Sequence, residues 1–389
     1  MNAYIIQGYR SAVAKAKKGG FKNYRSDDLA VDVINFLMQS VPQLDPKRVD
    51  DVIVGCANPE GEQGLQVGRL IAARALGKEV PGFTINRYCA SGLEAIGLAA
   101  AKINAGYGDI YVAGGAESMS LIPMTGYKLS PSYKAAVDNI NYHVSMGKTA
   151  EAVAEKYEVT REQADEFSYN SHVKAANAID SGFFKDEIVP VTVEDVFVKD
   201  GKRVESNHVV DTDEGVRRTT TVEGLAKLRA VFKQNGIVTA GNSSQTSDGA
   251  AFTLVVSEKI VNELNLKPIA RLLSCSVAGV DPLYMGIGPC AAIPKALERA
   301  NLKLKDIEQI ELNEAFAAQA LAVIKTAELN PEIVNVNGGA IALGHPLGCT
   351  GAKLTIQLLN EMKRRNQKYG MVTACVGGGQ GIAGIFERL

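Results

Sequence analysis

The sequence of 389 residues contains no tryptophan, only four histidines and no excess of charge of either sign. Its 42 basic and 43 acidic side chains give a formal net charge of −1, which argues against a protein that binds nucleic acid or a membrane surface. None of its six cysteines belongs to a C-x-x-C pair, so the sequence predicts neither a zinc site nor a thioredoxin-type centre, and we expect no metal.

Long hydrophobic runs are also missing. The longest uncharged stretches, residues 333–352 and 371–386, are interrupted by Gly, Pro, Asn or Thr and are not typical of membrane spans. No apolar segment behind a basic N-terminus indicates a secretory leader. We therefore expect a protein without a membrane span, located in the cytoplasm, whose cysteines stay reduced.

Glycine, in contrast, is abundant at 38 residues, and strand-like runs alternate with helical segments, which is typical of an α/β fold. A helix capped by Ser26 is predicted at residues 26–39, because acidic residues fill its first turn. The remaining predictions are strands at 4–7, 51–55, 83–86 and 109–113, and helices at 90–102, 149–157, 161–181 and 350–365.

The second half of the chain repeats the plan of the first. Residues 48–54 resemble 306–312, residues 84–86 resemble 334–337, and residues 109–115 resemble 370–377, in the same order. The three pairs predict a duplicated α/β unit, with chance similarity of short segments as the alternative. We predict an N-terminal half at 1–119 that is completed by about 250–268, an inserted loop domain at 120–249, and a C-terminal half at 269–389.

Cys89 is the first candidate for chemistry. It ends a β-prone run at the point where a helix of small residues is predicted to begin. The positive end of the helix dipole and the free backbone N–H groups favour a thiolate at such a position, so we predict that Cys89 is a nucleophile with a lowered pKa. A buried structural cysteine is the alternative.

Three further segments carry residues suited to acid/base work. His345 lies in the uncharged stretch 335–351, where a neutral imidazole is placed to accept a thiol proton, unless it is simply an exposed loop residue. Cys375 precedes a glycine-rich turn at 377–381 that can present N–H groups to an anion, or it is a buried cysteine beside a β-turn. Asn313 ends another strand, where its amide can hold a water or an oxyanion, or cap the next helix.

Five segments together resemble the motifs of the thiolase family, in the family's order and over nearly the full chain. They are Asn-Arg-Tyr-Cys-Ala-Ser-Gly at 86–92, Gly-Asn-Ser-Ser at 241–244 with Ser-Asp-Gly-Ala-Ala at 247–251, Asn-Glu-Ala-Phe at 313–316, Gly-His-Pro at 344–346 and Cys-Val-Gly-Gly-Gly at 375–379. The resemblance implies the thiolase fold, in which two similar α/β halves pack as five α-β-α-β-α layers and a loop domain is inserted in the first half.

The resemblance also implies roles for individual residues. Cys89 would be the acylated nucleophile, His345 its base, and Cys375 the second acid/base. Asn313, together with His345, would bind the water of one oxyanion hole. The backbone N–H groups of Cys89 and Gly377 would form the other.

The implied activity is cleavage of a 3-ketoacyl-CoA by CoA in fatty-acid β-oxidation, an acyl transfer. Biosynthetic acetoacetyl-CoA members usually carry His-Met-Gly in the loop domain, whereas here Ser145 precedes Met146 and His143 comes two residues early. This departure favours the degradative 3-ketoacyl-CoA type. The alternatives are an acetoacetyl-CoA acetyltransferase and a non-catalytic acyl-CoA-binding subunit. A decarboxylating ketosynthase is disfavoured, because such enzymes normally have His or Asn where Cys375 stands.

Contacts with CoA are also carried over from the family, and they place CoA binding largely in the loop domain. They fall on Met146, Arg217, Phe232, Ser244, Met285 and Phe316. Core packing is the alternative for Phe232, Met285 and Phe316, and a solvated face is the alternative for Arg217. We expect CoA as co-substrate with no permanently bound cofactor. We also expect a homodimer or homotetramer, compatible with association with other β-oxidation enzymes, and no nucleic-acid partner.

Overall fold

The computed structural model describes residues 2–389, and most of its strands belong to one hydrogen-bonded path. The path contains β1 (Ala3–Ser11), β3 (Asp51–Gly55), β4 (Gly82–Ile85), β5 (Ile110–Ser118), β9 (Ser247–Ser257), β10 (Ala270–Gly279), β11 (Gln309–Leu312), β12 (Tyr369–Val376) and β13 (Gln380–Arg388). Two short strands flank it, β2 (Ala14–Lys15) beside β9 and β6 (Ile188–Val189) beside β1.

The path has the same topology on either side of its middle. In the first half β1 and β5 pair antiparallel with β9, and β3 runs parallel to β5 and β4. In the second half β10 and β12 pair antiparallel with β13, and β11 runs parallel to β12 and to an isolated bridge at Val334. The predicted duplication is confirmed. Two pairs of similar segments fall on equivalent strands, β3 with β11 and β5 with β12, and the third matches β4 with the isolated bridge at Val334.

The two halves meet at a short antiparallel contact between β1 and β10. Only Tyr4 with Arg271 and Ile5 with Ala270 are paired there. Since the rest of each strand pairs within its own half, the path divides at this point into two sheets. They share one layer of helices between them and face different helices on their outer sides.

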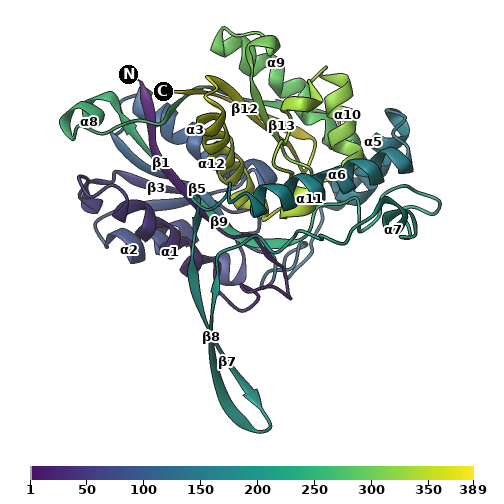
Figure 1. The fold of residues 1–389 in the computed structure, drawn as a ribbon, viewed down its shortest axis with the longest axis horizontal. Coiled ribbons are helices and arrows are strands. Elements are labelled where there is room, and N and C mark those ends of the chain that lie inside the picture. Colours follow the sequence, from purple (N-terminus) through teal and green to yellow (C-terminus); the bar gives the residue numbers. More distant parts are fainter. Residues whose placement is uncertain (1) are drawn as a thin grey trace.

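Six helices cover these sheets in three layers (Figure 1). The layers are α1 (Ser26–Gln39) with α2 (Val67–Leu76), then α3 (Ser91–Asn104) with α12 (Leu347–Arg365), and then α9 (Gly288–Ala300) with α10 (Ala317–Thr326). Strand β3 shows why: Val52 and Val54 pack with α1 and α2, whereas Ile53 points to the opposite face, toward α3 and α12. The five-layer α-β-α-β-α arrangement is confirmed.

The segment between β5 and β9 lies largely outside these layers. It contains α4 (Tyr133–Asp138), α5 (Met146–Lys156), α6 (Arg161–Asp180), β7 (Val191–Lys199), β8 (Lys202–Val210) and α7 (Val222–Ala226). The hairpin β7–β8 projects away from the body of the molecule, while α5 and α6 lie near α10 (Figure 1). The domain limits 1–119, 120–249 and 269–389 stay a prediction. The remaining helices are α8 (Glu258–Glu263) and α11 (Ala340–Leu343).

Several local predictions need correction. The prediction that Ser26 caps α1 is wrong, because Ser26 is already helical. Arg25 precedes the helix, and no side chain caps it. Strands β1 and β5 extend well beyond the predicted ranges, and α12 begins at Leu347, directly after Pro346. All six cysteines are free, and no helix within residues 2–389 is both long and apolar enough to cross a bilayer.

Candidate active site

Cys89 lies on a short 3-10 helix, Tyr88–Ala90, between β4 and α3. Its neighbour Tyr88 has a φ of 43°, a left-handed conformation that costs a non-glycine residue about 1–3 kcal/mol. Two side chains hold the turn: Tyr88 N–H donates to Oδ1 of Asn86 at 2.8 Å, and the Ser91 hydroxyl donates to the Tyr88 carbonyl at 2.8 Å. The turn leaves Cys89 only 9% exposed.

The environment of Cys89 contradicts the predicted thiolate. Burial raises the pKa of its thiol to about 12, although the backbone N–H groups of Gly377 and of Cys89 itself act in the opposite direction. The cost of burying an anion exceeds the stabilisation by the two N–H groups, so the thiol is neutral before it meets a base. The same two N–H groups lie beside the sulfur, where they can bind an anionic oxygen on an attached carbon.

Cys375 comes from the other half of the chain, at the end of β12. It is fully buried, and burial together with the neighbouring Cys89 raises the pKa of its thiol well above the usual value. The turn that follows has positive φ at Gly378 (79°) and Gly379 (84°), a conformation suited to glycine, so that β13 can fold back at once. This hairpin places Gly377 beside Cys89.

His345 is 4% exposed, so the alternative of an exposed loop histidine is wrong. Its Nδ1 lies 2.6 Å from Oγ1 of Thr350, and the Thr350 hydroxyl lies 2.9 Å from the carbonyl of Pro346. Because a carbonyl can only accept, the hydroxyl donates to Pro346 and must accept from Nδ1–H of His345. Nε2 therefore carries no proton and can act as an acceptor. Burial, and then the positive charge of Lys353, lower the pKa of His345 to about 3, so the ring is neutral.

Asn313 donates from its side-chain amide to Nε2 of His345. Its Nδ2 lies 3.3 Å from Nε2 of His345, and its Oδ1 is buried without a hydrogen-bond partner among residues 2–389. The alternative of a helix cap is wrong, because α10 begins after Phe316 and no side chain caps it. A buried carbonyl oxygen without a protein partner is a site for a water or a ligand proton.

The segment that closes the loop domain aligns these groups. Ser244 N–H donates to the Ala315 carbonyl at 3.0 Å, and Ala317 N–H donates to the Asn242 carbonyl at 2.9 Å. At the residue after Ser244, the Gln245 carbonyl accepts from His345 N–H at 3.2 Å. Ser244 is therefore held beside the residues that follow Asn313 and close to His345.

An apolar cluster surrounds Cys375. Met285 and Phe316 are buried in it, and Met146 packs against it. Phe232 stands 37% exposed at its edge, with its ring edge-on to Phe316 at 6.4 Å. The core-packing alternative is thus wrong for Phe232, whereas Met285 and Phe316 are buried in a small cluster that includes Cys375.

Arg217 lies apart from the cysteines. It lines a surface pocket of about 550 Å³ together with residues 216–221, Gly224, Leu225 and Leu228. Its N–H donates to Nδ1 of His172 at 3.2 Å, and its neighbour Arg218 pairs with Asp180. Its side chain is exposed, so the structure leaves the solvated-face alternative open.

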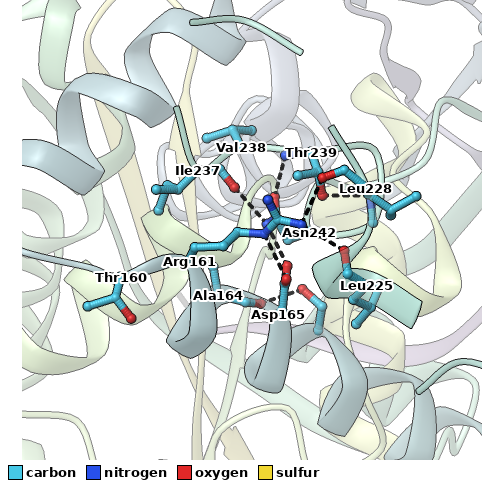
Figure 2. Close-up of polar contacts among 12 residues, drawn as sticks. Thr160, Arg161, Ala164, Asp165, Leu225, Leu228, Ile237, Val238, Thr239 and Asn242 are labelled. Atoms are coloured by element: carbon cyan, nitrogen blue, oxygen red, sulfur yellow. Dashed lines mark hydrogen bonds and ion pairs between the residues drawn. The ribbon is translucent and has the colours of Figure 1, made fainter. Parts of the chain in front are cut away.

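The chain between this pocket and Ser244 is fixed by a polar network (Figure 2). The guanidinium of Arg161 on α6 contacts Asp165 at 2.7 Å and donates to the carbonyls of Leu225 at 2.7 Å and Leu228 at 3.0 Å. Asn242 donates to the same Asp165 at 2.9 Å. Both ends of the segment that carries Phe232 are therefore tied to one helix.

The structure brings most of the predicted residues to one place. Arg217 lies outside this site. The site contains Cys89, His345, Cys375, Asn313, Gly377, Ser244, Met146, Met285, Phe316 and Phe232. The sequence analysis did not select Thr350, although its position five residues after His345 at a helix start was a usable signal. It also did not select Glu117, a buried acidic residue near the end of β5. Within the part of the chain that the structure describes, no cluster of His, Cys, Asp or Glu is arranged to hold a metal ion.

Comparison with known proteins places this site in a family. Residues 3–259 match the N-terminal domain of thiolase and residues 266–388 match its C-terminal domain. The chain belongs to the thiolase family, whose members are acyltransferases.

Similar proteins cover the whole chain. A 3-ketoacyl-CoA thiolase of Bacillus subtilis is 51% identical over 99% of both chains. A 3-oxoadipyl-CoA/3-oxo-5,6-dehydrosuberyl-CoA thiolase of Escherichia coli is 42% identical over 100% of this chain and 99% of that protein. The crystal structure of a Bacillus anthracis acetyl-CoA acetyltransferase matches with a TM-score of 0.89 and 40% identity, over 100% of this chain and 99% of that one.

Proposed function

We propose that the protein is a 3-ketoacyl-CoA thiolase of fatty-acid β-oxidation. It cleaves a 3-ketoacyl-CoA with CoA to give acetyl-CoA and a shortened acyl-CoA, through an acyl-enzyme on Cys89. The observation that carries the proposal is the juxtaposition of Cys89 and Cys375, which come from different halves of the chain. A neutral His345, whose unprotonated Nε2 is contacted by Asn313, supports it. Similarity to the 3-ketoacyl-CoA thiolase of Bacillus subtilis supports it.

In the first step, Nε2 of His345 accepts the Cys89 proton as the sulfur attacks C3 of the substrate. The C3 oxygen becomes an anion between the N–H groups of Cys89 and Gly377. The C2–C3 bond then breaks, and its electron pair passes to the departing acetyl-CoA enolate. The enolate oxygen is held by Nε2–H of His345 and a water on Asn313, while Cys375 protonates C2.

In the second step, the Cys375 thiolate takes the proton of an incoming CoA thiol. The CoA sulfur attacks the acyl group on Cys89, again with the oxygen between the N–H groups of Cys89 and Gly377. Cys89 leaves as a thiolate and recovers its proton from His345. Two thiols and a neutral imidazole can run this cycle because every anion is formed beside an acid or a pair of N–H donors.

CoA is the co-substrate in this proposal, and no permanent cofactor is required. The CoA thiol arm is proposed to contact residues in and beside the apolar cluster around Cys375. They are Met146, Phe232, Ser244, Met285 and Phe316. Arg217 is proposed to meet a CoA phosphate, because its pocket lies at the far end of the segment held by Arg161.

The acyl side of the site supports a 3-ketoacyl substrate longer than acetoacetyl-CoA. Ser145 is exposed at the start of α5, and His143 is turned to the Ser132 carbonyl at 3.3 Å. The residue directly before Met146 is thus a serine and not a histidine, which leaves room for a longer acyl chain. Each buried methylene contributes about 0.8 kcal/mol. The similarity to the Bacillus anthracis acetyl-CoA acetyltransferase favours acetoacetyl-CoA as the second candidate.

Thiolysis rates for 3-ketoacyl-CoA substrates of increasing length separate these candidates. We expect kcat/KM to hold or rise from the four-carbon to the eight-carbon substrate. A fall of roughly a hundredfold or more, about 2.7 kcal/mol, would assign the chain to the acetoacetyl-CoA type.

A binding-only subunit is tested by the acyl-enzyme itself. After exposure to acetyl-CoA, mass spectrometry of the intact protein should show one acetyl group in the wild type and none in Cys89→Ala. Cys290→Ser, a partly exposed cysteine on α9, serves as the control and should still be acylated. An unmodified wild-type protein would support the binding-only alternative.

Self-association as a homodimer or homotetramer also remains a proposal, as does the cytoplasmic location. Strand β4 is an edge strand, and all four of its residues are half-buried. The segment between β5 and α5 exposes large apolar side chains, which are Met124, Tyr127, Leu129, Tyr133, Val137, Ile140 and Tyr142. Exposed apolar surface of this kind marks an interface. Light scattering coupled to gel filtration distinguishes a monomer, dimer and tetramer.

A further inference from the structure

Glu117 is a buried carboxylate that the reaction scheme does not use. It stands near the end of β5 and is 1% exposed. No cation contacts it within residues 2–389; instead, five hydrogen-bond donors converge on its two oxygens. They are the backbone N–H groups of Ala57 (2.7 Å), Gly348 (2.8 Å) and Asn58 (3.3 Å), the side-chain amide of Gln63 (2.8 Å) and the thiol of Cys56 (3.7 Å).

These donors come from both halves of the chain. Ala57 and Asn58 follow β3 in the first half, and Gly348 lies in the first turn of α12 in the second half. Oε2 alone accepts from Ala57 and from Gly348. The N–H of Gly348 belongs to the turn of helix that has no backbone acceptor of its own, and an anion is favourable there.

Hydrogen bonds on either side of Ala57 connect this oxygen to Tyr88, the residue directly before Cys89. The Ala57 carbonyl accepts from Nδ2 of Asn86 at 2.8 Å, and Oδ1 of Asn86 accepts from the N–H of Tyr88 at 2.8 Å. In the other direction, Gly348 is three residues from His345. Glu117 is therefore the point at which the turn that carries Cys89 is joined to the turn that carries His345.

We propose that Glu117 is a positioning residue for thiolysis, which sets the separation of Cys89 and His345 by bridging Ala57 and Gly348. The proposal rests on the proposed function, because it assigns proton transfer from Cys89 to His345. It adds a residue that touches neither the substrate nor the two reacting side chains. Misplacement of reacting groups by about 1 Å is enough to lower a rate by roughly a hundredfold.

Two variants test the bridge. Glu117→Gln keeps one acceptor oxygen and replaces the other with an NH₂ group. That group is itself a donor, so the donors on that side lose their acceptor. Glu117→Asp keeps the charge and withdraws it by one methylene. We expect both to lower kcat by about 10–100-fold, while KM for CoA changes by less than about threefold. Rates are expressed per folded molecule, because loss of folded protein lowers the active concentration without changing KM or the kcat of each folded molecule.

Asp50 supplies the matched control. Its Oδ2 accepts the N–H groups of Asp109 (2.7 Å) and Ile110 (2.9 Å), at the opposite end of β5. Asp50→Asn removes a comparable backbone anchor from the same strand, and we expect kcat within about twofold of wild type. If the Glu117 variants, corrected for folded fraction by circular dichroism, keep kcat within about threefold, the proposal is overturned.

A second measurement does not depend on thiolase turnover. Alkylation of Cys89 by iodoacetamide, followed by mass spectrometry, is compared in wild type, Glu117→Gln, His345→Ala and the double variant. We expect Glu117→Gln to slow alkylation about tenfold or more when His345 is present and not to slow it further when His345 is absent. Equal slowing in both backgrounds means that Glu117 does not act through His345 and overturns the proposal. A wild type without thiolysis, combined with the expected alkylation pattern, overturns the proposed function alone.

Discussion

The Thr350 hydroxyl lies 2.6 Å from Nδ1 of His345 and, by donating its own proton to the Pro346 carbonyl, holds that nitrogen protonated. The arrangement fixes one tautomer of a buried, neutral ring and leaves Nε2 as the only basic nitrogen. It arises from the first turn of α12, where a threonine hydroxyl bonds back to the carbonyl four residues earlier. The helix start therefore sets both the direction and the proton position of the base.

Thr350→Val should test this directly. Without the hydroxyl, Nδ1–H of His345 loses its acceptor. The ring then gains by moving its proton to Nε2, where Oδ1 of Asn313 can accept it once the amide has turned over. We expect kcat to fall by about 10–100-fold, since a general base typically contributes about 10²–10⁴-fold. KM for CoA should change little. Steady-state thiolysis kinetics provide the measurement.

Thr350→Ser is the matched control, because it keeps the hydroxyl and removes only a methyl group. We expect it to retain kcat within about threefold of wild type. A Val variant as active as the Ser variant would show that His345 keeps its tautomer without Thr350.

Cys375→Ser separates the two half-reactions. Transfer of an acetyl group from acetyl-CoA to Cys89 needs His345 first, whereas C–C cleavage also needs an acid at C2 of the enolate. A hydroxyl is a much weaker acid than a thiol, so we expect thiolysis to fall by about 10²–10⁴-fold and acyl-enzyme formation to fall less. Quenched-flow kinetics with mass detection of acyl-Cys89 measure both rates. Wild-type thiolysis in this variant would make Cys375 a purely structural cysteine.

The proposed catalytic positions could be selected from local sequence, because Cys89, Asn313, His345 and Cys375 each end a strand or turn with a short, ordered motif. The sign of the Cys89 pKa shift was not predictable. A helix start favours a thiolate, but the cost of burying the sulfur depends on packing from both halves, and that cost is the larger effect. Glu117 escaped prediction for a similar reason, since its five donors come from separated segments.

The fold shows the same division between local and long-range information. The duplicated order of segments predicted the two halves, and the strand pairing β3–β5 and β11–β12 repeats as expected. The ends of elements were less well predicted. The wrong cap at Ser26 and the late start assigned to α12 both depended on which backbone N–H groups find partners in three dimensions.

Gly147→Ala should disturb CoA binding more than chemistry. A Cβ built at Gly147 would lie 2.2 Å from the ring of Phe232, so the ring must move away from Phe316 or α5 must shift. If Phe232 contacts CoA, we expect KM for CoA to rise by about three- to tenfold with kcat less affected, the pattern of lost uniform binding.

Gly279→Ala is a suitable control, because a methyl group added at this glycine of β10 would meet no atom within 4 Å. We expect KM for CoA to stay within about twofold of wild type. A Gly147 variant that lowers kcat and leaves KM unchanged would place Phe232 with the reacting groups instead of with CoA.

The buried, neutral His345 also makes stability depend on pH. Its pKa falls from 6.5 to about 3 on folding. As the pH drops below 6.5, His345 takes up a proton in the unfolded chain but stays neutral in the folded protein. The contribution of the neutral His345 to the free energy of unfolding is therefore complete above pH 6.5 and is lost as the pH falls toward 3. Between pH 7 and pH 5 this single group should lower the free energy of unfolding by about 2 kcal/mol.

Urea unfolding of wild type, His345→Asn and His143→Asn at pH 7 and pH 5 isolates the effect from that of the carboxylates. An asparagine at 345 cannot take up a proton in either state, so its stability should fall by about 2 kcal/mol less than that of wild type over the same interval. His143 is exposed, with its Nε2 3.3 Å from the Ser132 carbonyl, and its variant is the control that should follow wild type. An identical pH dependence in His345→Asn would mean that folding leaves the pKa of His345 unchanged, which would contradict a lowered pKa of the buried imidazole.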